Sequence, residues 1–259
     1  MNNIKLNKYY IIIIIIFIIL YFINIYLFIF NTKTIINFKE NYKNRKNNIG
    51  ILLTCTVIIN NDIRQLILRN SETRKNIYIK SIKQWLEKTN FPIVVVENSN
   101  YNFPELNMEK ELYKDRFEII SFEGTTKKHC EKIIEKDSKG IYELFSIIYA
   151  YEHSSLLRNL DYIIKVTGRY FVPNLEDNLN NMNQNIYKVV QQKNSYRCEI
   201  IGVHKSVFKT IFDINDVHSH IEYTYRNRLN KYKNEKWILP TLKIEPTING
   251  GFGKYVSEL

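Results

Sequence analysis

The feature that most constrains the fold is an apolar run that ends in a polar turn, LDYIIKVTGRYFVPN, at residues 160–174. Its first part is typical of a buried strand in an α/β sheet whose faces are covered by helices. Such sheets bind ligands beyond the carboxyl ends of their strands, which is where Thr167, Gly168, Arg169 and Tyr170 would lie. Lys165 stands inside the apolar run, where a charge needs a partner. The run therefore favours an anion-binding edge, and an ordinary strand end with a solvated arginine remains the alternative.

The rest of the chain alternates between strand and helix patterns. We expect strands at Ile49–Ile59, Phe91–Val96, Phe117–Phe122, Tyr162–Val166, Tyr187–Gln191 and Cys198–Val203, and an extended segment at Ile238–Pro246. We expect helices at Ile63–Lys88 with an interruption at Asn70–Ser71, at Glu131–Leu160 with a break at Ser138–Gly140, and at Ile221–Lys233. Glu176 and Asp177 are expected in the first turn of a further helix. This alternation predicts an α/β domain with a mostly parallel, helix-covered sheet.

The N-terminal part is organised differently. Residues 9–30 form an uncharged run of 22 residues whose only strongly polar member is Asn24. A helix of that length spans about 33 Å, enough to cross a bilayer. We therefore expect a tail at residues 1–8, one transmembrane helix at 9–30, a basic stem at 31–48 and a globular domain at 49–259. A buried helix of a soluble protein is the alternative for the apolar run.

The side of the membrane that the domain faces is left open. The basic residues that follow the run favour a cytoplasm-facing domain, and no N-x-S/T glycosylation acceptor occurs in the chain. A type II arrangement, with the domain in the Golgi or ER lumen, requires the opposite orientation.

The net charge of +11 does not indicate a nucleic-acid-binding protein. Residues 1–48 hold seven basic residues against one acidic residue, so much of the excess flanks the apolar run, where lipid headgroups attract it. Residues 49–259 show no basic face of the kind that nucleic acid requires. The three cysteines are widely spaced and form no CxxC, which predicts neither a metal site nor a disulfide framework.

The K-x-T-G-R-Y segment resembles a motif of small glycosyltransferases with a GT-A-type (Rossmann-type) fold, which take part in polysaccharide biosynthesis in bacteria and large DNA viruses. VVVENSN at residues 94–100 and KGIYELFSIIYAYEHSSLL at 139–157 extend the resemblance in the same order. One departure is visible, because Tyr142 stands before Glu143 where the family has glycine.

The resemblance implies a nucleotide-sugar donor as substrate, a glycan or other hydroxyl acceptor, and no cofactor. In this family the turn after the second strand lies against the nucleoside of the donor. A helix that starts at Lys139 and Gly140 would favour an anion. The donor-binding residues are then expected to be Glu97, Asn98, Ser99, Lys139, Gly140, Glu143, Lys165, Thr167, Gly168, Arg169 and Tyr170.

The chain lacks the Asp-x-Asp with which metal-dependent GT-A enzymes hold a divalent cation against the donor diphosphate. We therefore expect no metal. Fixed cations can stabilise a leaving diphosphate instead, and Lys165 and Arg169 are the candidates. Arg169 is favoured because a guanidinium can bind phosphate in bidentate fashion.

If transfer inverts the stereochemistry, the acceptor hydroxyl needs a base. Glu222, at the start of the helical segment IEYTYRNRL, is the candidate base, and a solvated glutamate at a helix start is the alternative. His218 and His220 have no third ligand in pattern, so a metal site there is not expected.

The sequence leaves a second function open and disfavours a third. A membrane-tethered, inactive GT-A-like module that binds nucleotide or glycan remains possible, since Tyr142 and the missing Asp-x-Asp allow it. A methyltransferase would require a glycine-rich turn after the first strand, which is missing.

Overall fold

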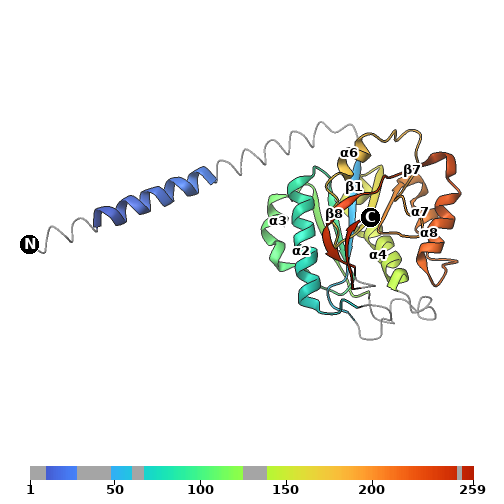
Figure 1. Cartoon of the computed structure of the whole chain (residues 1–259), viewed down its shortest axis with the longest axis horizontal. Coiled ribbons are helices and arrows are strands. Elements are labelled where there is room, and N and C mark those ends of the chain that lie inside the picture. Colours follow the sequence, from blue (N-terminus) through green and yellow to red (C-terminus); the bar gives the residue numbers. More distant parts are fainter. Residues whose placement is uncertain (1–9, 28–47, 60–66, 125–138, 250–252) are drawn as a thin grey trace, which may run out of the picture. The chain divides into compact units, whose positions relative to one another are not determined.

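The computed structural model describes residues 10–27, 48–59, 67–124, 139–249 and 253–259 (Figure 1). The chain divides into two units, Met1–Lys46 and Asn47–Leu259. They are treated separately below.

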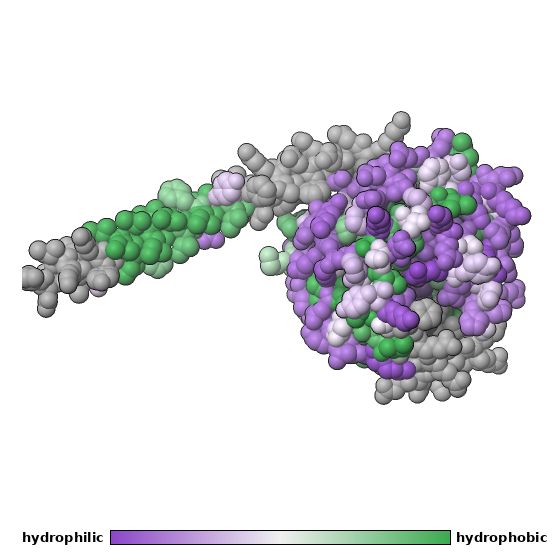
Figure 2. All heavy atoms as spheres, viewed as in Figure 1, coloured by the Kyte–Doolittle hydropathy of each residue, from purple (hydrophilic) through white to green (hydrophobic). Residues whose placement is uncertain are grey.

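The first unit contains one helix, Tyr10–Leu27, within the described residues. Its length and composition are sufficient to cross a membrane, none of its residues is buried, and its surface is apolar along its length (Figure 2). The polar exception, Asn24, donates its Nδ2 to the backbone oxygen of Leu20 at 2.9 Å, so its amide is partly satisfied within the helix, as an apolar environment requires. The predicted tail, residues 9 and 28–30, and the stem up to residue 47 lie outside the described residues.

The second unit is built on a sheet in which the described residues supply seven strands, in the order β3-β2-β1-β4-β6-β5-β7. The strands β1, β2, β3 and β4 run parallel, β6 is antiparallel to β4 and β5, and β7 is parallel to β5. Every residue of β1 and β2 is buried. The bounds are β1 Ile49–Cys55, β2 Ile93–Glu97, β3 Phe117–Ser121, β4 Tyr162–Thr167, β5 Val189–Gln191, β6 Ile200–His204 and β7 Lys236–Ile238.

Two hydrophobic cores cover the two faces of the sheet because successive strand residues point to opposite sides. Ile51 and Leu53 of β1 share one core with Trp85 of α2. Leu52 shares the other core with residues of α4, α7 and α8. Figure 1 shows α2 and the pair α7 and α8 on opposite sides of β1. The α-helical bounds are α2 Ser71–Lys88, α3 Asn107–Leu112, α4 Lys139–His153, α5 Ser155–Arg158, α6 Leu175–Asn180, α7 Phe208–Ile211 and α8 Ile221–Asn230.

Short elements complete the unit. A separate hairpin of β8 and β9 packs on the α2 side, where Leu242, Ile244 and Leu259 join the core. Its bounds are β8 Lys243–Ile248 and β9 Tyr255–Glu258, and 3₁₀ turns lie at Pro104–Leu106, Lys205–Val207 and Lys233–Glu235.

The predicted fold class, an α/β domain with a mostly parallel sheet covered by helices, is confirmed, and several boundaries are corrected. The first strand ends at Cys55 rather than Ile59. The predicted interruption at Asn70–Ser71 is the start of α2, where the Asn70 side chain caps the helix by accepting from the backbone N of Thr73 at 2.8 Å. The helix predicted to reach Leu160 breaks at Ser154, which caps α5.

The elements that sequence patterns missed are α3, α7, β7 and β9. Each has at most six residues, too few for a periodic pattern to stand out. The predicted first-turn position of Glu176 and Asp177 is confirmed in α6.

Candidate functional site

The polar residues that follow the parallel strands meet at one edge of the sheet. In the strand register, Cys55 at the end of β1 lies beside Glu97 at the end of β2, and Thr54 lies beside Thr167 at the end of β4. Since β6 is antiparallel to β4, its first residues lie at the same edge, where the backbone N of Thr167 donates to the oxygen of Glu199 at 2.9 Å. This carboxyl edge of β1 and β4 is the candidate site.

Glu97 and Ser99 form a closed turn after β2. The Glu97 carboxylate accepts from the backbone N of Val57 at 2.8 Å, Ser99 at 2.9 Å and Tyr101 at 2.7 Å, and from the Ser99 hydroxyl. Glu97 is fully buried. Burial raises its pKa, and these hydrogen bonds oppose the rise. Both oxygens are occupied within the protein, so this geometry gives Glu97 a role in shaping the loop, and direct contact with a donor stays a prediction.

Asn98 ties three elements together. Its Oδ1 accepts from the Thr56 hydroxyl at 2.7 Å, and its Nδ2 donates to Ser146 Oγ in α4 at 3.0 Å. Ser146 in turn donates to the backbone oxygen of Tyr142 at 2.7 Å. The buried amide therefore fixes the start of α4 against the ends of β1 and β2.

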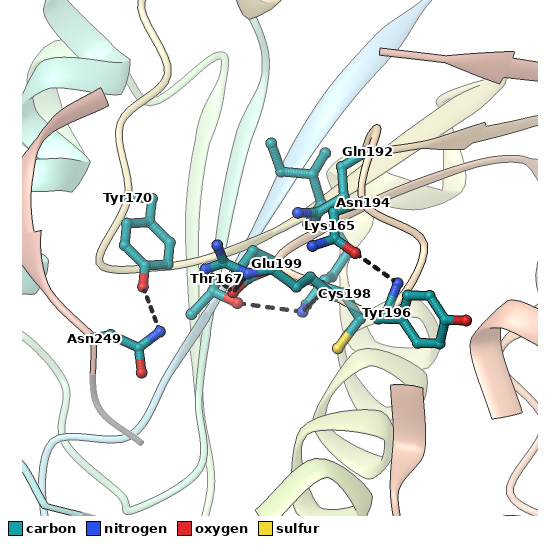
Figure 3. A network of polar contacts seen from close by, with 11 residues as sticks. Lys165, Thr167, Tyr170, Gln192, Asn194, Tyr196, Cys198, Glu199 and Asn249 are labelled. Carbon is teal, nitrogen blue, oxygen red and sulfur yellow. Dashed lines mark hydrogen bonds and ion pairs between the residues drawn. The ribbon is translucent and has the colours of Figure 1, made fainter. Parts of the chain in front are cut away.

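Lys165, the charged residue inside β4, is paired with Glu143 of the same chain. Lys165 is fully buried, and its Nζ lies 2.8 Å from Glu143 Oε1. It also lies 2.8 Å from the backbone oxygen of Cys198 and 3.3 Å from Thr167 Oγ1 (Figure 3). Burial alone would lower the pKa of Lys165, but Glu143 and the neighbouring groups raise it overall. An ammonium group has three donors, and all three are used, so an external anion would have to displace one of these partners.

Among the described residues, only one of the two carboxylate oxygens of Glu143 is bonded. Its Oε1 accepts from Lys165 and, at 2.6 Å, from the hydroxyl of Thr54. Within the described part of the chain no group donates to its Oε2, and the side chain is 20% exposed. Glu143 therefore presents one oriented, unbonded carboxylate oxygen at the carboxyl edge.

The TGRY turn brings the chain close to β1. The backbone N of Gly168 donates to Thr54 O at 2.9 Å. A Cβ at position 168 would lie 2.4 Å from Cys55 Sγ and 2.7 Å from Thr54 O, so this approach requires glycine. The next residue, Arg169, is half-buried.

Arg169 is a cation without a carboxylate partner among the described residues. Its guanidinium lies 5.6 Å from the centroid of the Tyr170 ring. Tyr170 itself is buried, and burial raises its pKa. A ring contact does not use the five N–H donors of Arg169, so its charge is available to an anion at this edge.

A second arginine, Arg74, was missed by sequence analysis. It is buried in α2 and donates to the backbone oxygens of Thr56 at 2.6 Å and Leu68 at 3.1 Å, and to the Tyr78 hydroxyl at 2.8 Å. Arg74 therefore fixes the hydroxyl of Tyr78 beside the end of β1. No pattern marks Arg74, since it stands in a helix with many other basic residues and only the packing of α2 brings it to this edge.

Lys139 and Gly140 begin α4 in the described structure. The side chain of Lys139 lies outside the described atoms, so the expected anion contact there stays a prediction. A Cβ at Gly140 would lie 2.3 Å from Cγ2 of Ile221. The glycine therefore serves the close packing of α4 against α8.

Glu222, the predicted base, lies half-buried in the first turn of α8. Burial raises the pKa of Cys198, and the charges of Lys165, Glu143 and Glu222 also act on it. Glu222 and Glu143 lie on α8 and α4, two helices that pack closely where Gly140 meets Ile221. The rings of His218 and His220 stack at 5.9 Å, and the described residues contain no group of three or more His, Cys, Asp or Glu that could hold a metal ion.

No family model and no curated protein matches the sequence. Several solved structures have similar folds. A protein of Desulfovibrio desulfuricans G20 named as a nucleotide-diphospho-sugar transferase matches 75% of this chain over 80% of its own, with 12% identity and a TM-score of 0.47.

Two further likenesses are partial. The glycosyltransferase GlyE of Streptococcus pneumoniae TIGR4 has 10% identity and a TM-score of 0.43 over 75% of this chain. The bifunctional glycosyltransferase WbbM has 12% identity and a TM-score of 0.45 over 76%. This chain spans 45% and 39% of those two chains. Such values are too low to transfer an activity or the role of a residue.

Proposed function

We propose that this chain is a membrane-anchored glycosyltransferase that moves a sugar from a nucleotide-sugar donor to a glycan or other hydroxyl acceptor without a metal ion. The observation that carries the proposal is the half-buried guanidinium of Arg169, which has no carboxylate partner in the described residues. It lies at the carboxyl edge of a mostly parallel α/β sheet, where such sheets bind ligands. The resemblance of the K-x-T-G-R-Y segment to glycosyltransferases supports the same assignment.

The chemistry follows from charge. A leaving nucleoside diphosphate gains negative charge in the transition state, and a fixed cation in a water-poor cleft stabilises it. Arg169 lies against the Tyr170 ring, 5.6 Å from its centroid, and this contact orients the guanidinium. Gly168 removes the side chain that would otherwise separate this turn from β1. The diphosphate is thus proposed to bind over the TGRY turn.

Two carboxylates are available to take the proton of the acceptor. Glu222 keeps its predicted role, and Glu143 is a second candidate because Lys165 and Thr54 fix one of its oxygens and leave the other unbonded. Comparing Glu222→Gln with Glu143→Gln in a transfer assay separates them. The proton-accepting residue should lose at least about 10²-fold in turnover when made an amide.

One observation favours the alternative of a membrane-tethered module that binds nucleotide or glycan without turnover. Lys165, one of the two cations expected to meet the diphosphate, is neutralised by Glu143. Binding of donor without sugar transfer or donor hydrolysis would establish this alternative.

The deciding experiment is calorimetric titration of the full-length protein in detergent with UDP, GDP and CMP, with and without EDTA. We expect at least one nucleotide to bind equally well with EDTA present. Arg169→Ala should abolish that binding, whereas Arg158→Ala should not, because Arg158 is exposed and donates only to the backbone oxygen of Glu152 at 3.2 Å. Absence of binding to all three nucleotides, or transfer that EDTA stops and Mn²⁺ restores, would contradict the proposal.

The membrane anchor is proposed on the uncharged run at residues 9–30 and the helix Tyr10–Leu27. The protein should resist extraction from membranes by alkaline carbonate, and a chain that starts at residue 49 should be soluble. Release of the full-length protein by carbonate alone would contradict a transmembrane helix.

A further inference from the structure

A surface cluster next to the candidate site is built from one arginine between two exposed tyrosines. The guanidinium of Arg226 lies 4.4 Å from the ring centroid of Tyr196 and 4.8 Å from that of Tyr223. Tyr196 is 68% exposed and Tyr223 is 43% exposed. Tyr223 and Arg226 lie one turn apart on α8, and Tyr196 comes from the loop between β5 and β6. We call these three residues the tyrosine platform.

The hydrogen-bonding groups of Arg226 are unused, in contrast to those of its neighbour Arg228. Arg228 donates to the backbone oxygens of Ile211 at 2.9 Å, Asp213 at 2.7 Å and Asn215 at 2.7 Å, which holds the preceding loop. Within the described residues Arg226 makes no hydrogen bond and no ion pair, only the two ring contacts. Cation–π contacts orient the guanidinium while leaving its five N–H donors free.

The platform adjoins the candidate site through both of its elements. Cys198, two residues after Tyr196, accepts from Lys165 at its backbone oxygen at 2.8 Å, and Figure 3 shows Tyr196 and Cys198 on one loop beside Lys165. On α8, Glu222 lies one turn before Arg226, so both side chains share a helix face. Arg226, 4.4 Å from the Tyr196 ring, connects this part of α8 to the loop that carries Cys198.

The composition of the platform fits a carbohydrate. Exposed tyrosine rings offer flat apolar surface at low entropic cost, and their hydroxyls remain polar. Sugar rings present one face of C–H groups, which packs on such rings, and oxygen atoms around the edge, which accept from a guanidinium. We propose that Tyr196, Tyr223 and Arg226 bind the carbohydrate acceptor and lead it to Glu222 and Glu143. This inference rests on the proposed function, because the transfer site defines which sugar is the acceptor.

The test uses saturation-transfer NMR on the full-length protein in detergent with three probes: cellohexaose, mannohexaose and hexagalacturonic acid. We expect at least one hexasaccharide to bind and its C–H protons to receive saturation. Tyr196→Ala, Tyr223→Ala and Arg226→Gln should each weaken that binding roughly 3- to 10-fold. Tyr255→Ala is the matched control, because Tyr255 is 70% exposed on β9, away from the platform, and binding should be unchanged.

The outcomes separate the platform from the proposed function. Lack of binding to all three hexasaccharides, or an equal loss in Tyr255→Ala, overturns the platform, whatever the nucleotide titration shows. Binding that depends on the platform, together with no binding of UDP, GDP or CMP, supports the platform as a glycan-binding surface while the proposed transferase activity fails. If the hexagalacturonic acid signal alone depends on Arg226, the bound sugar is acidic.

Discussion

The two sides of the carboxyl edge differ in how far their polar groups are already used. On the β2 side, Glu97 and Asn98 are buried and their side-chain oxygens are occupied by the protein itself. On the β6 and α8 side, Arg226 has no hydrogen bond in the described residues, and Tyr196 is largely exposed. Between them, Glu143 has one oxygen fixed by Lys165 and Thr54, and no group in the described part of the chain donates to the other.

This contrast indicates that the two sides of the carboxyl edge have different roles, one in stability and one in binding. A buried polar group whose bonds are complete holds geometry, and losing a partner there costs stability. A partly exposed group with free donors is hydrated, so it carries little desolvation cost, and a ligand can replace the water bound to it. We therefore expect substitutions on the β2 side to act on folding, and substitutions of Arg169 and the tyrosine platform to act on binding and turnover.

The largest stability effect is expected at the junction of the two sides. Glu143→Ala leaves Lys165 buried and unpaired, which should cost about 3–5 kcal/mol of the free energy of unfolding. The double variant Glu143→Ala with Lys165→Met should recover most of that loss, since a neutral side chain needs no counter-charge. Urea denaturation of both variants measures this. A double variant no more stable than Glu143→Ala would show that the buried charge is not the cause.

Arg169→Ala should lower turnover by roughly 10²–10³-fold and change stability far less than Glu143→Ala does. Arg169→Lys should restore only part of the activity because an ammonium lacks the bidentate geometry. Steady-state kinetics beside thermal melting separate the two effects. If Arg169→Ala unfolds the protein and leaves the turnover of the folded fraction intact, the residue belongs to the scaffold instead.

Asn98→Ala removes the bridge between Thr56 and Ser146. The half-buried hydroxyl of Thr56 and the buried hydroxyl of Ser146 each lose a partner, which should cost about 1–3 kcal/mol of stability. Denaturant titration tests this, with Asn178→Ala as control, because Asn178 is a half-buried asparagine whose amide, among the described residues, donates only to the backbone oxygen of Asn174, at 2.7 Å. Equal losses in the two variants would contradict the scaffold role of Asn98.

The smallest effect is expected at the opposite edge of β4, where Asp161 accepts from Lys205 at 2.6 Å. Lys205 holds the pKa of Asp161 below its ordinary value, mainly by this hydrogen bond. The pKa of Asp161 is lower in the folded protein than in the unfolded chain. The ion pair therefore stabilises the fold at pH values above the unfolded-state pKa, and this stabilisation is lost as the pH falls through the folded-state pKa. Asp161→Asn should therefore be slightly less stable than wild type at pH 7 and equal to it at strongly acid pH. Both side chains are largely solvent-accessible, so the difference should also shrink in high salt.

The sequence predicts which strand ends form the site better than it predicts which side chains contact one another there. The apolar runs that became β1, β2 and β4 end in polar residues, and parallel pairing alone brings Thr54, Glu97 and Thr167 to one edge. Which side chains contact one another depends on how each helix is rotated about its axis against the sheet. The partner that the buried charge of Lys165 needs is Glu143, which α4 brings to it, and contact of Lys165 with a donor stays a prediction.

The contacts of Arg74 and Arg226 depend on packing between segments far apart in the chain. Arg74 reaches Thr56 only because α2 lies against the end of β1. Arg226 contacts Tyr196, which lies in a loop 30 residues earlier in the chain. Neither residue belongs to a local motif. Chains rich in Lys, Asn and Tyr offer many such side chains, so only the folded structure distinguishes them.

Gly140 sets the distance between α4, which carries Glu143, and α8, which carries Glu222. Because Gly140 has no side chain, α4 can pack directly against Ile221 of α8. Ile221 immediately precedes Glu222, and Gly140 lies three residues before Glu143. A methyl group at position 140 would collide with Ile221, so the two helices would have to separate and the distance between the two carboxylates would change with them.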